Sequence, residues 1–144
     1  MKILHTADWH LGKKIEGLSR IDEQIAVMEE ICSIADAEAV NAVLIAGDVF
    51  DTYNPSIEAE ELFFKTVYRL SGNGSRVVLV IAGNHDSPDR IRASDPLAVQ
   101  NGIFLLGYPH TIIKKVKLDS GIEVIRSESG FAEFSLPACN RNMR

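Results

Sequence analysis

The sequence predicts an α/β fold built on a largely parallel sheet, and two observations support this assignment. Three short apolar runs, at residues 3–4, 40–46 and 76–82, are rich in Val, Ile and Leu and are bounded by turn residues. Amphipathic patterns with helical spacing lie between these runs. Strands that alternate with helices in this way usually pair in parallel, with helices covering the sheet.

The two connections between these runs are predicted to be helices. In the first, apolar residues repeat at helical spacing after a candidate N-cap at Ser19; they are Ile21, Ile25, Met28, Cys32 and Ala35. The second begins with Asn54 as a candidate cap and Pro55 in the first turn. Its inner face carries Leu62, Phe63, Val67 and Leu70, and residues 71–74 end it.

Beyond Gly83 the pattern becomes less regular. We expect a helix over residues 87–98 and a strand over residues 103–106. Residues 111–118 and 123–126 indicate a hairpin that turns at residues 119–121. Apolar residues alternate from Phe131, and a polar run begins at Asn140. We therefore predict one domain over residues 1–137, followed by a polar tail over residues 138–144.

Composition is typical of a globular protein but argues against DNA binding by general basicity. Apolar residues make up 46% and charged residues 24% of the chain. A net charge of −5 means that metal ions, local Lys or Arg, or a partner must attract any nucleic acid. Cys32 and Cys139 form no CxxC pair. Neither a signal-peptide core nor a membrane-length apolar run is present, so we expect a cytoplasmic protein without a membrane partner.

Each of the three predicted strands ends in a polar cluster. Asp8 and His10 follow the first strand, Asp48 follows the second, and Asn84 and His85 follow the third. Asp48 and Asn84 each come directly after a glycine, which permits a sharp turn and a close approach at the strand exit. Because loops at the carboxyl ends of parallel strands converge on one edge, we expect these side chains to meet there.

These residue types suit a pair of divalent metal ions. Asp8 and His10 can face one ion, Asp48 can bridge two, and Asn84 offers a neutral oxygen to the second. A metal pair clamps the attacking and leaving oxygens of a phosphoryl displacement and activates water. His85 can reach the phosphate or the leaving group, as a transition-state stabiliser or general acid. The mixed ligands favour Mn²⁺, with Zn²⁺, Fe²⁺ and Mg²⁺ as alternatives.

Structural roles compete with this interpretation at several positions. Asp-x-His alone, or Gly-Asp after a strand, is more often a turn or a helix cap than a metal site, and only the three clusters together favour chemistry. His5 is expected to be a core or ligand-supporting histidine, Trp9 a packing residue and His110 solvated. Asp51 and Asp86 are expected to orient ligands or to cap helices.

The segments 3–12 (ILHTADWHLG), 46–51 (AGDVFD) and 82–87 (AGNHDS) resemble the first three motifs of the calcineurin-like metallophosphoesterases. The motif sequences DWHLG and AGDVFD are similar to those of the SbcD branch of bacterial nucleases. The resemblance implies a layered α-β-β-α sandwich, of which this chain supplies the N-terminal part. It also implies that Asp8, His10 and Asp48 hold one metal, that Asp48 and Asn84 hold the other, and that His85 assists at the scissile phosphate.

The same resemblance implies a Mn²⁺-dependent 3′-to-5′ exonuclease acting on double-stranded DNA, with a hairpin-opening endonuclease activity, in DNA repair and recombination. It implies an SbcC-like ATPase subunit as partner and leaves room for a homodimer. Two rivals stay open: a small-molecule phosphoesterase on the same scaffold, and a truncated, non-catalytic subunit.

One feature of the family is missing from the sequence. Its members supply three further metal-binding histidines from later motifs, including Gly-His-x-His. This chain contains no such motif. We therefore expect the chain alone to bind metal weakly and to cleave DNA poorly or not at all.

Overall fold

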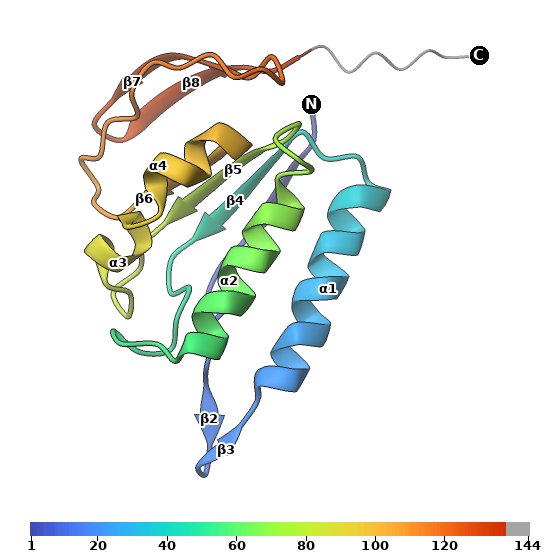
Figure 1. Cartoon of the computed structure of the whole chain (residues 1–144), viewed down its shortest axis with the longest axis vertical. Coiled ribbons are helices and arrows are strands. Elements are labelled where there is room, and N and C mark those ends of the chain that lie inside the picture. Colours follow the sequence, from blue (N-terminus) through green and yellow to red (C-terminus); the bar gives the residue numbers. More distant parts are fainter. Residues whose placement is uncertain (138–144) are drawn as a thin grey trace.

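A four-stranded parallel sheet forms the centre of the computed structural model, which describes residues 1–137 (Figure 1). The strands are β1 (Ile3–Thr6), β4 (Ala42–Ala46), β5 (Val77–Ile81) and β6 (Ile103–Leu106), and they lie side by side in that order. All three strand pairs are parallel, so their carboxyl ends lie along one edge. The α/β prediction is confirmed, and the strand over residues 103–106 lies where we expected it.

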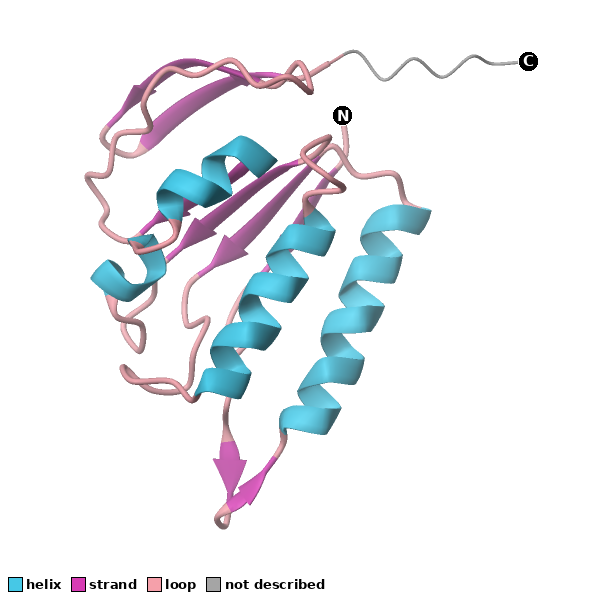
Figure 2. Cartoon of the chain, viewed as in Figure 1, coloured by secondary structure: helices cyan, strands magenta, loops and turns pink. Residues whose placement is uncertain are grey.

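Two long helices, α1 (Ile21–Ala37) and α2 (Ile57–Leu70), lie side by side over one face of this sheet (Figure 2). Both begin slightly later than predicted. The hydroxyl of Ser56 accepts the N–H of Ala59 and caps α2, whereas the carbonyl of Asn54 accepts the Thr52 hydroxyl within the preceding loop. The cap position of α1 belongs to Arg20, one residue after Ser19.

The core between the helices and the sheet follows the predicted helical stripes with one exception. Its fully buried side chains come from the inner faces of both helices and from alternate strand positions, and they include Met28, Cys32, Ala35, Phe63, Val67, Leu70, Val43, Ile45, Val78 and Val80. Ile25 was expected in this stripe but is 43% exposed, because it lies in the groove between α1 and α2. Burial raises the pKa of the Cys32 thiol, as expected for a buried cysteine that stays neutral.

The single helix predicted over residues 87–98 is instead broken into α3 (Pro88–Arg92) and α4 (Asp95–Ala98), followed by the 3₁₀ turn η1 (Val99–Asn101). Pro96 explains the break. In a continuous helix its ring would clash with the carbonyl four residues earlier, at Arg92, and it has no N–H to donate there. α3 ends at that residue.

The predicted hairpin with its turn at residues 119–121 forms only next to that turn. Lys117 bridges to Glu123, and the N–H groups of Leu118 and Val124 donate to the carbonyls of Ile122 and Val116, each at 2.8 Å. The regular partner of β7 (Glu123–Glu128) is instead β8 (Phe131–Ser135), which pairs with it antiparallel. The β7–β8 connection has two residues and places Gly130 at φ +73°, which suits a tight hairpin. A second small hairpin, β2 (Lys14–Ile15) and β3 (Leu18–Ser19), was not predicted.

The β7–β8 ribbon covers part of the second face of the parallel sheet (Figure 1). Val124 and Ile122 pack there against Val77 and Phe104, which belong to β5 and β6. The ribbon therefore adds the beginning of a second β layer to one half of the sheet. The cover is incomplete, because Ile3 of β1 and Ile81 at the end of β5 are 49% and 45% exposed.

His5 is exposed, so the first of its two expected roles, a place in the core, is wrong. The predicted polar tail, residues 138–144, lies outside the described residues. Within residues 1–137, none of the helices combines the length and apolarity needed to cross a bilayer.

Arg76 joins the helix layer to the start of β5. The residue is 9% exposed. Its guanidinium donates to the carbonyls of Val40 and Leu70, at 3.0 and 2.9 Å, and to Oδ1 of Asp36, at 3.0 Å. Val40 and Leu70 lie where the chain leaves α1 and α2. The buried Arg76 guanidinium is therefore the side-chain donor to the backbone carbonyls of Val40 and Leu70.

Replacing this guanidinium should cost stability. Arg76→Met keeps much of the apolar stem but strands two carbonyls, so we expect the free energy of unfolding to fall by about 2–4 kcal/mol in urea denaturation. The matched control is Arg126→Met, because Arg126 pairs with Glu128 on the surface; its loss should change stability by less than about 1 kcal/mol. Equal losses in the two variants would contradict this role for Arg76.

Candidate metal centre

The loops that follow β1 and β4 run together past the ends of the strands. The N–H of Asp8 donates to the carbonyl of Gly47 at 3.1 Å, that of His10 to Asp48 at 2.9 Å, and that of Leu11 to Val49 at 2.9 Å. The β1–β4 pairing thus continues in irregular form beyond Thr6. It carries the first two polar clusters to the same place at the sheet edge.

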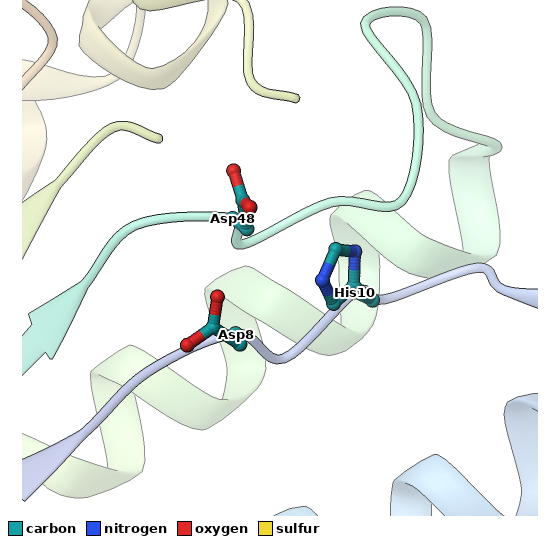
Figure 3. A group of neighbouring side chains, drawn as sticks. All are labelled: Asp8, His10 and Asp48. Atoms are coloured by element: carbon teal, nitrogen blue, oxygen red, sulfur yellow. The ribbon is translucent and has the colours of Figure 1, made fainter. Parts of the chain in front are cut away.

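Three of the predicted ligands gather at this edge. Asp8, His10 and Asp48 each offer one ligand atom, and these atoms all lie within 4.8 Å of one another. Figure 3 shows Asp8 and His10 on the β1 loop, with Asp48 on the neighbouring loop. Asp8 is exposed, whereas His10 and Asp48 are half-buried. Two carboxylates and one imidazole make a donor set that suits a divalent cation.

His10 provides a test of whether a cation fits. Among the described residues, its Nδ1 is the buried side-chain polar atom that has no hydrogen-bond partner. A buried nitrogen in that state is costly unless another group satisfies it. The nearest acidic atom is Oδ1 of Asp51, 3.4 Å away. The His10 imidazole can therefore bind a positive ion directly, or the Asp51 carboxylate can orient it.

The same three residues have an unusual backbone conformation. The φ angles of Asp8, His10 and Asp48 are 56°, 45° and 44°, in the left-handed region that non-glycine residues seldom occupy. Each such residue costs about 1–3 kcal/mol and persists only where its surroundings hold it. Among the described residues, three of the six non-glycine residues with positive φ thus offer ligand atoms at one point, which is consistent with a functional site.

Glycine permits the close approach of the third loop. A Cβ atom on Gly83 would lie 2.2 Å from both the backbone nitrogen and Oδ1 of Asp48, so no other residue fits without moving Asp48. Gly47 has a φ of +81°. The expectation that both glycines serve a sharp, close strand exit is confirmed.

Asp86 holds the third loop against the second. Its carboxylate is buried, with 2% of the residue exposed, and accepts three backbone N–H groups. Oδ2 accepts from Gly83 at 2.8 Å and from Val49 at 3.1 Å, and Oδ1 accepts from Phe50 at 2.9 Å. Capping of α3 falls to Ser87 instead. Of the two roles expected for Asp86, the structure therefore supports the one that orients the site.

His85 and Asn84 lie on that third loop, both exposed. The backbone N–H of His85 donates to Oδ1 of Asp48 at 3.0 Å, and its ring lies edge-on to His10 with centroids 5.1 Å apart. Nδ1 of His85 is 3.0 Å from the carbonyl of Asp51. Because a carbonyl only accepts, Nδ1 carries the hydrogen, and Nε2 is the atom left to exchange a proton with a ligand.

The remaining residues singled out in the sequence have clear surroundings. Oδ1 of Asp51 lies between His10 and the Lys13 ammonium, 3.8 Å from Nζ, and Asp51 does not cap α2. Trp9 packs against Phe63 and donates from Nε1 to the Thr6 hydroxyl at 2.9 Å, which confirms its packing role. His110 is exposed, as expected.

Sequence reasoning missed Gln24. Its side-chain amide, on α1, contacts the backbone of residues 9, 10 and 12. A signal was present, because Gln24 lies three residues after Ile21 and four before Met28, which makes it a polar residue in an inward-facing helical stripe.

The Asp86 contacts lead to a stability prediction. Asp86→Asn keeps one acceptor oxygen but turns an N–H₂ group toward backbone N–H donors, so we expect a loss of about 2–3 kcal/mol in urea unfolding. Asp119→Asn, at an exposed turn residue, is the matched control and should be within about 0.5 kcal/mol of the unchanged protein. If Asp86→Asn were as stable as this control, the buried carboxylate would not be what joins the two loops.

Comparisons with known proteins agree with this geometry. The chain is 50% identical over 125 residues to the SbcD subunit of the SbcCD nuclease of Bacillus subtilis strain 168, which covers 87% of this chain and 32% of that protein. The SbcD protein of Rhodobacter capsulatus is 41% identical over 74% of this chain and 27% of its own length. That of Escherichia coli K12 is 44% identical over 60% of this chain and 22% of its own length.

The chain thus spans about a third, or less, of the length of these curated relatives. The family model described as calcineurin-like phosphoesterase matches residues 1–130, which include all three strand-end loops and the whole parallel sheet. The carboxylate and imidazole group at the sheet edge is the kind of site that this divalent-metal-dependent family requires. The chain belongs to the calcineurin-like phosphoesterase family.

Proposed function

We propose that this chain forms the N-terminal part of the catalytic site of an SbcD-type DNA nuclease, which hydrolyses phosphodiester bonds with two divalent metal ions. The observation that carries the proposal is the meeting of Asp8, His10 and Asp48, from separate strand ends, within 4.8 Å of one another. The similarity to three proteins named as subunits of SbcCD nucleases supports DNA as the substrate.

The proposed roles follow from the donor types and their positions. Asp8 and His10 hold one ion, Asp48 bridges the two, and Asn84, next to His85 on the loop after β5, offers its carbonyl oxygen to the second. When bound, the ions would polarise the phosphate and activate the attacking water. Manganese suits the mixture of oxygen and nitrogen ligands, and Mg²⁺ or another divalent ion is the alternative.

His85 is proposed to act on the scissile phosphate. Its Nδ1–H donates a hydrogen bond to the Asp51 carbonyl, at 3.0 Å, and this contact orients the ring. Nε2 is therefore the atom that would face the substrate, and in the imidazolium form it would donate a hydrogen bond to the phosphate or a proton to the leaving oxygen. The exposure of His85 lets a substrate as large as DNA reach this atom.

The wider activity is proposed from the relatives. We propose 3′-to-5′ exonuclease action on double-stranded DNA and opening of DNA hairpins, in the cytoplasm, together with an SbcC-like ATPase subunit and with room for a homodimer. The net charge of −5 means that DNA is attracted by the ions, by local basic groups such as Lys13, or by that partner. We also propose that residues 1–137 are the N-terminal part of one metallophosphoesterase domain.

Manganese binding tests the site directly. In calorimetric titrations we expect the chain to bind Mn²⁺. Asp48→Ala should weaken this binding by at least about 100-fold, because the variant lacks a direct ligand. Loss of a residue that only supports a ligand already lowers metal affinity by about 10–100-fold. Asp22→Ala, which removes an exposed carboxylate on α1, should leave binding unchanged. Equal affinities for the Asp48 and Asp22 variants would refute the site.

Substrate choice separates the nuclease from its rivals. We expect slow, Mn²⁺-dependent degradation of a duplex from its 3′ end, abolished by Asp48→Ala and slow because the chain has no Gly-His-x-His motif. Turnover of bis-p-nitrophenyl phosphate but not of duplex DNA would instead establish a small-molecule phosphoesterase. Metal-free binding of an SbcC-like subunit without any turnover would establish a non-catalytic subunit. Robust degradation would overturn the expected weakness of the chain alone.

A further inference from the structure

One side chain on α1 contacts the backbone around a proposed metal ligand at three points. Nε2 of Gln24 donates to the carbonyl of His10 at 2.8 Å and lies 3.4 Å from that of Trp9. Oε1 of the same amide accepts the N–H of Gly12 at 2.9 Å. Gln24 therefore pairs with the β1 loop much as a neighbouring strand would, on the side away from β4.

The loop needs such a partner because its conformation is strained. His10 and Gly12 have φ angles of 45° and 86°, and the Lys13 N–H donates to the His10 carbonyl at 3.1 Å, so the chain makes a tight turn at residues 10–13. On the β4 side the N–H groups of His10 and Leu11 are paired with Asp48 and Val49. Without Gln24, the Gly12 N–H would lose its contact with α1, and the His10 carbonyl would keep only the N–H of Lys13.

Gln24 is well placed to hold the loop rigidly. The side chain is half-buried, and Met28, one helical turn further along α1, is 4% exposed within the core. The position of Gln24 is thus fixed by helix packing rather than by the loop itself. A rigid support of this kind locks the residues that carry a site into their working geometry.

We propose that Gln24 is a positioning residue, which fixes the backbone of His10 so that the imidazole meets Asp8 and Asp48 at the metal centre. This inference rests on the proposed metal site and deepens it. Gln24 does not touch the reacting atoms and acts through His10. Residues that orient metal ligands typically change affinity by 10–100-fold when they are replaced.

The choice of variant follows from the surroundings of Gln24. The side chain lines a cavity of about 360 Å³ between α1 and the β1 loop, so a short replacement would admit water that could stand in for the amide. Gln24→Met keeps the length and the helix propensity but has no comparable donor or acceptor. Gln24→Asn keeps the amide on a shorter stem, so it separates reach from polarity.

The experiment measures Mn²⁺ affinity by calorimetry and imidazole coordination by the nitrogen coupling in pulsed EPR. We expect Gln24→Met to weaken Mn²⁺ binding about 10–100-fold and to reduce the imidazole signal, with Gln24→Asn similar. Gln100→Met, at an exposed glutamine in η1, is the matched control and should change neither. Thermal unfolding should show that all three variants are folded, since a loss of fold would remove the signals of every ligand together.

The outcomes separate this inference from the proposed site. Unchanged affinity and an unchanged imidazole signal in both Gln24 variants would overturn the positioning role and leave the metal site standing. An unmodified chain that bound Mn²⁺ without any imidazole signal would remove His10 from the site, and the inference would fall with it. Weaker binding with a fully retained imidazole signal would also count against the proposal, because Gln24 would then act on something other than His10.

Discussion

The carboxylate of Asp86, buried between two loops, is the contact on which the arrangement of the site depends. It accepts the N–H groups of Gly83, Val49 and Phe50, and so fastens the loop after β5 to the loop after β4. The three backbone donors satisfy the acceptor oxygens of this buried carboxylate. Gly83 then has to lie against Asp48, at a distance that excludes any Cβ atom. The place of His85 beside Asp48 follows from the same contact.

The site as a whole is maintained against its own local preferences. Asp8, His10 and Asp48 occupy left-handed backbone conformations, together a cost of several kcal/mol on the usual scale of about 1–3 kcal/mol each. The opposing contributions come from outside the ligands: the β1–β4 pairing, the Asp86 carboxylate and the Gln24 amide. The sheet, the helix layer and the loops therefore all help to hold these three residues in backbone conformations that isolated loops would not keep.

The sequence predicted those parts of the structure that repeat or that end in a recognisable motif. Buried runs of Val, Ile and Leu located the parallel strands, and the order of polar clusters located the edge at which Asp8, His10 and Asp48 meet. It failed where one residue outweighs a pattern, as Pro96 does in breaking a helix. It also missed the main partner of β7, which pairs along its length with β8, whereas residues 111–118 reach it only next to the turn. Gln24 and the left-handed φ angles depend on tertiary contacts, which periodicity and spacing do not encode.

The position of β1 in the sheet affects how easily the strand next to this metal centre opens. Within residues 1–137, β1 is hydrogen-bonded to β4 on one side and forms an edge of the sheet, whereas β4 and β5 lie inside it. Edge strands open more readily than central ones, often without global unfolding. Asp8 and His10 thus follow an edge strand, and Asp48 follows an interior one. An ion held by all three would link the edge of the sheet to its interior, so occupancy would slow the exchange of β1 amide hydrogens with solvent.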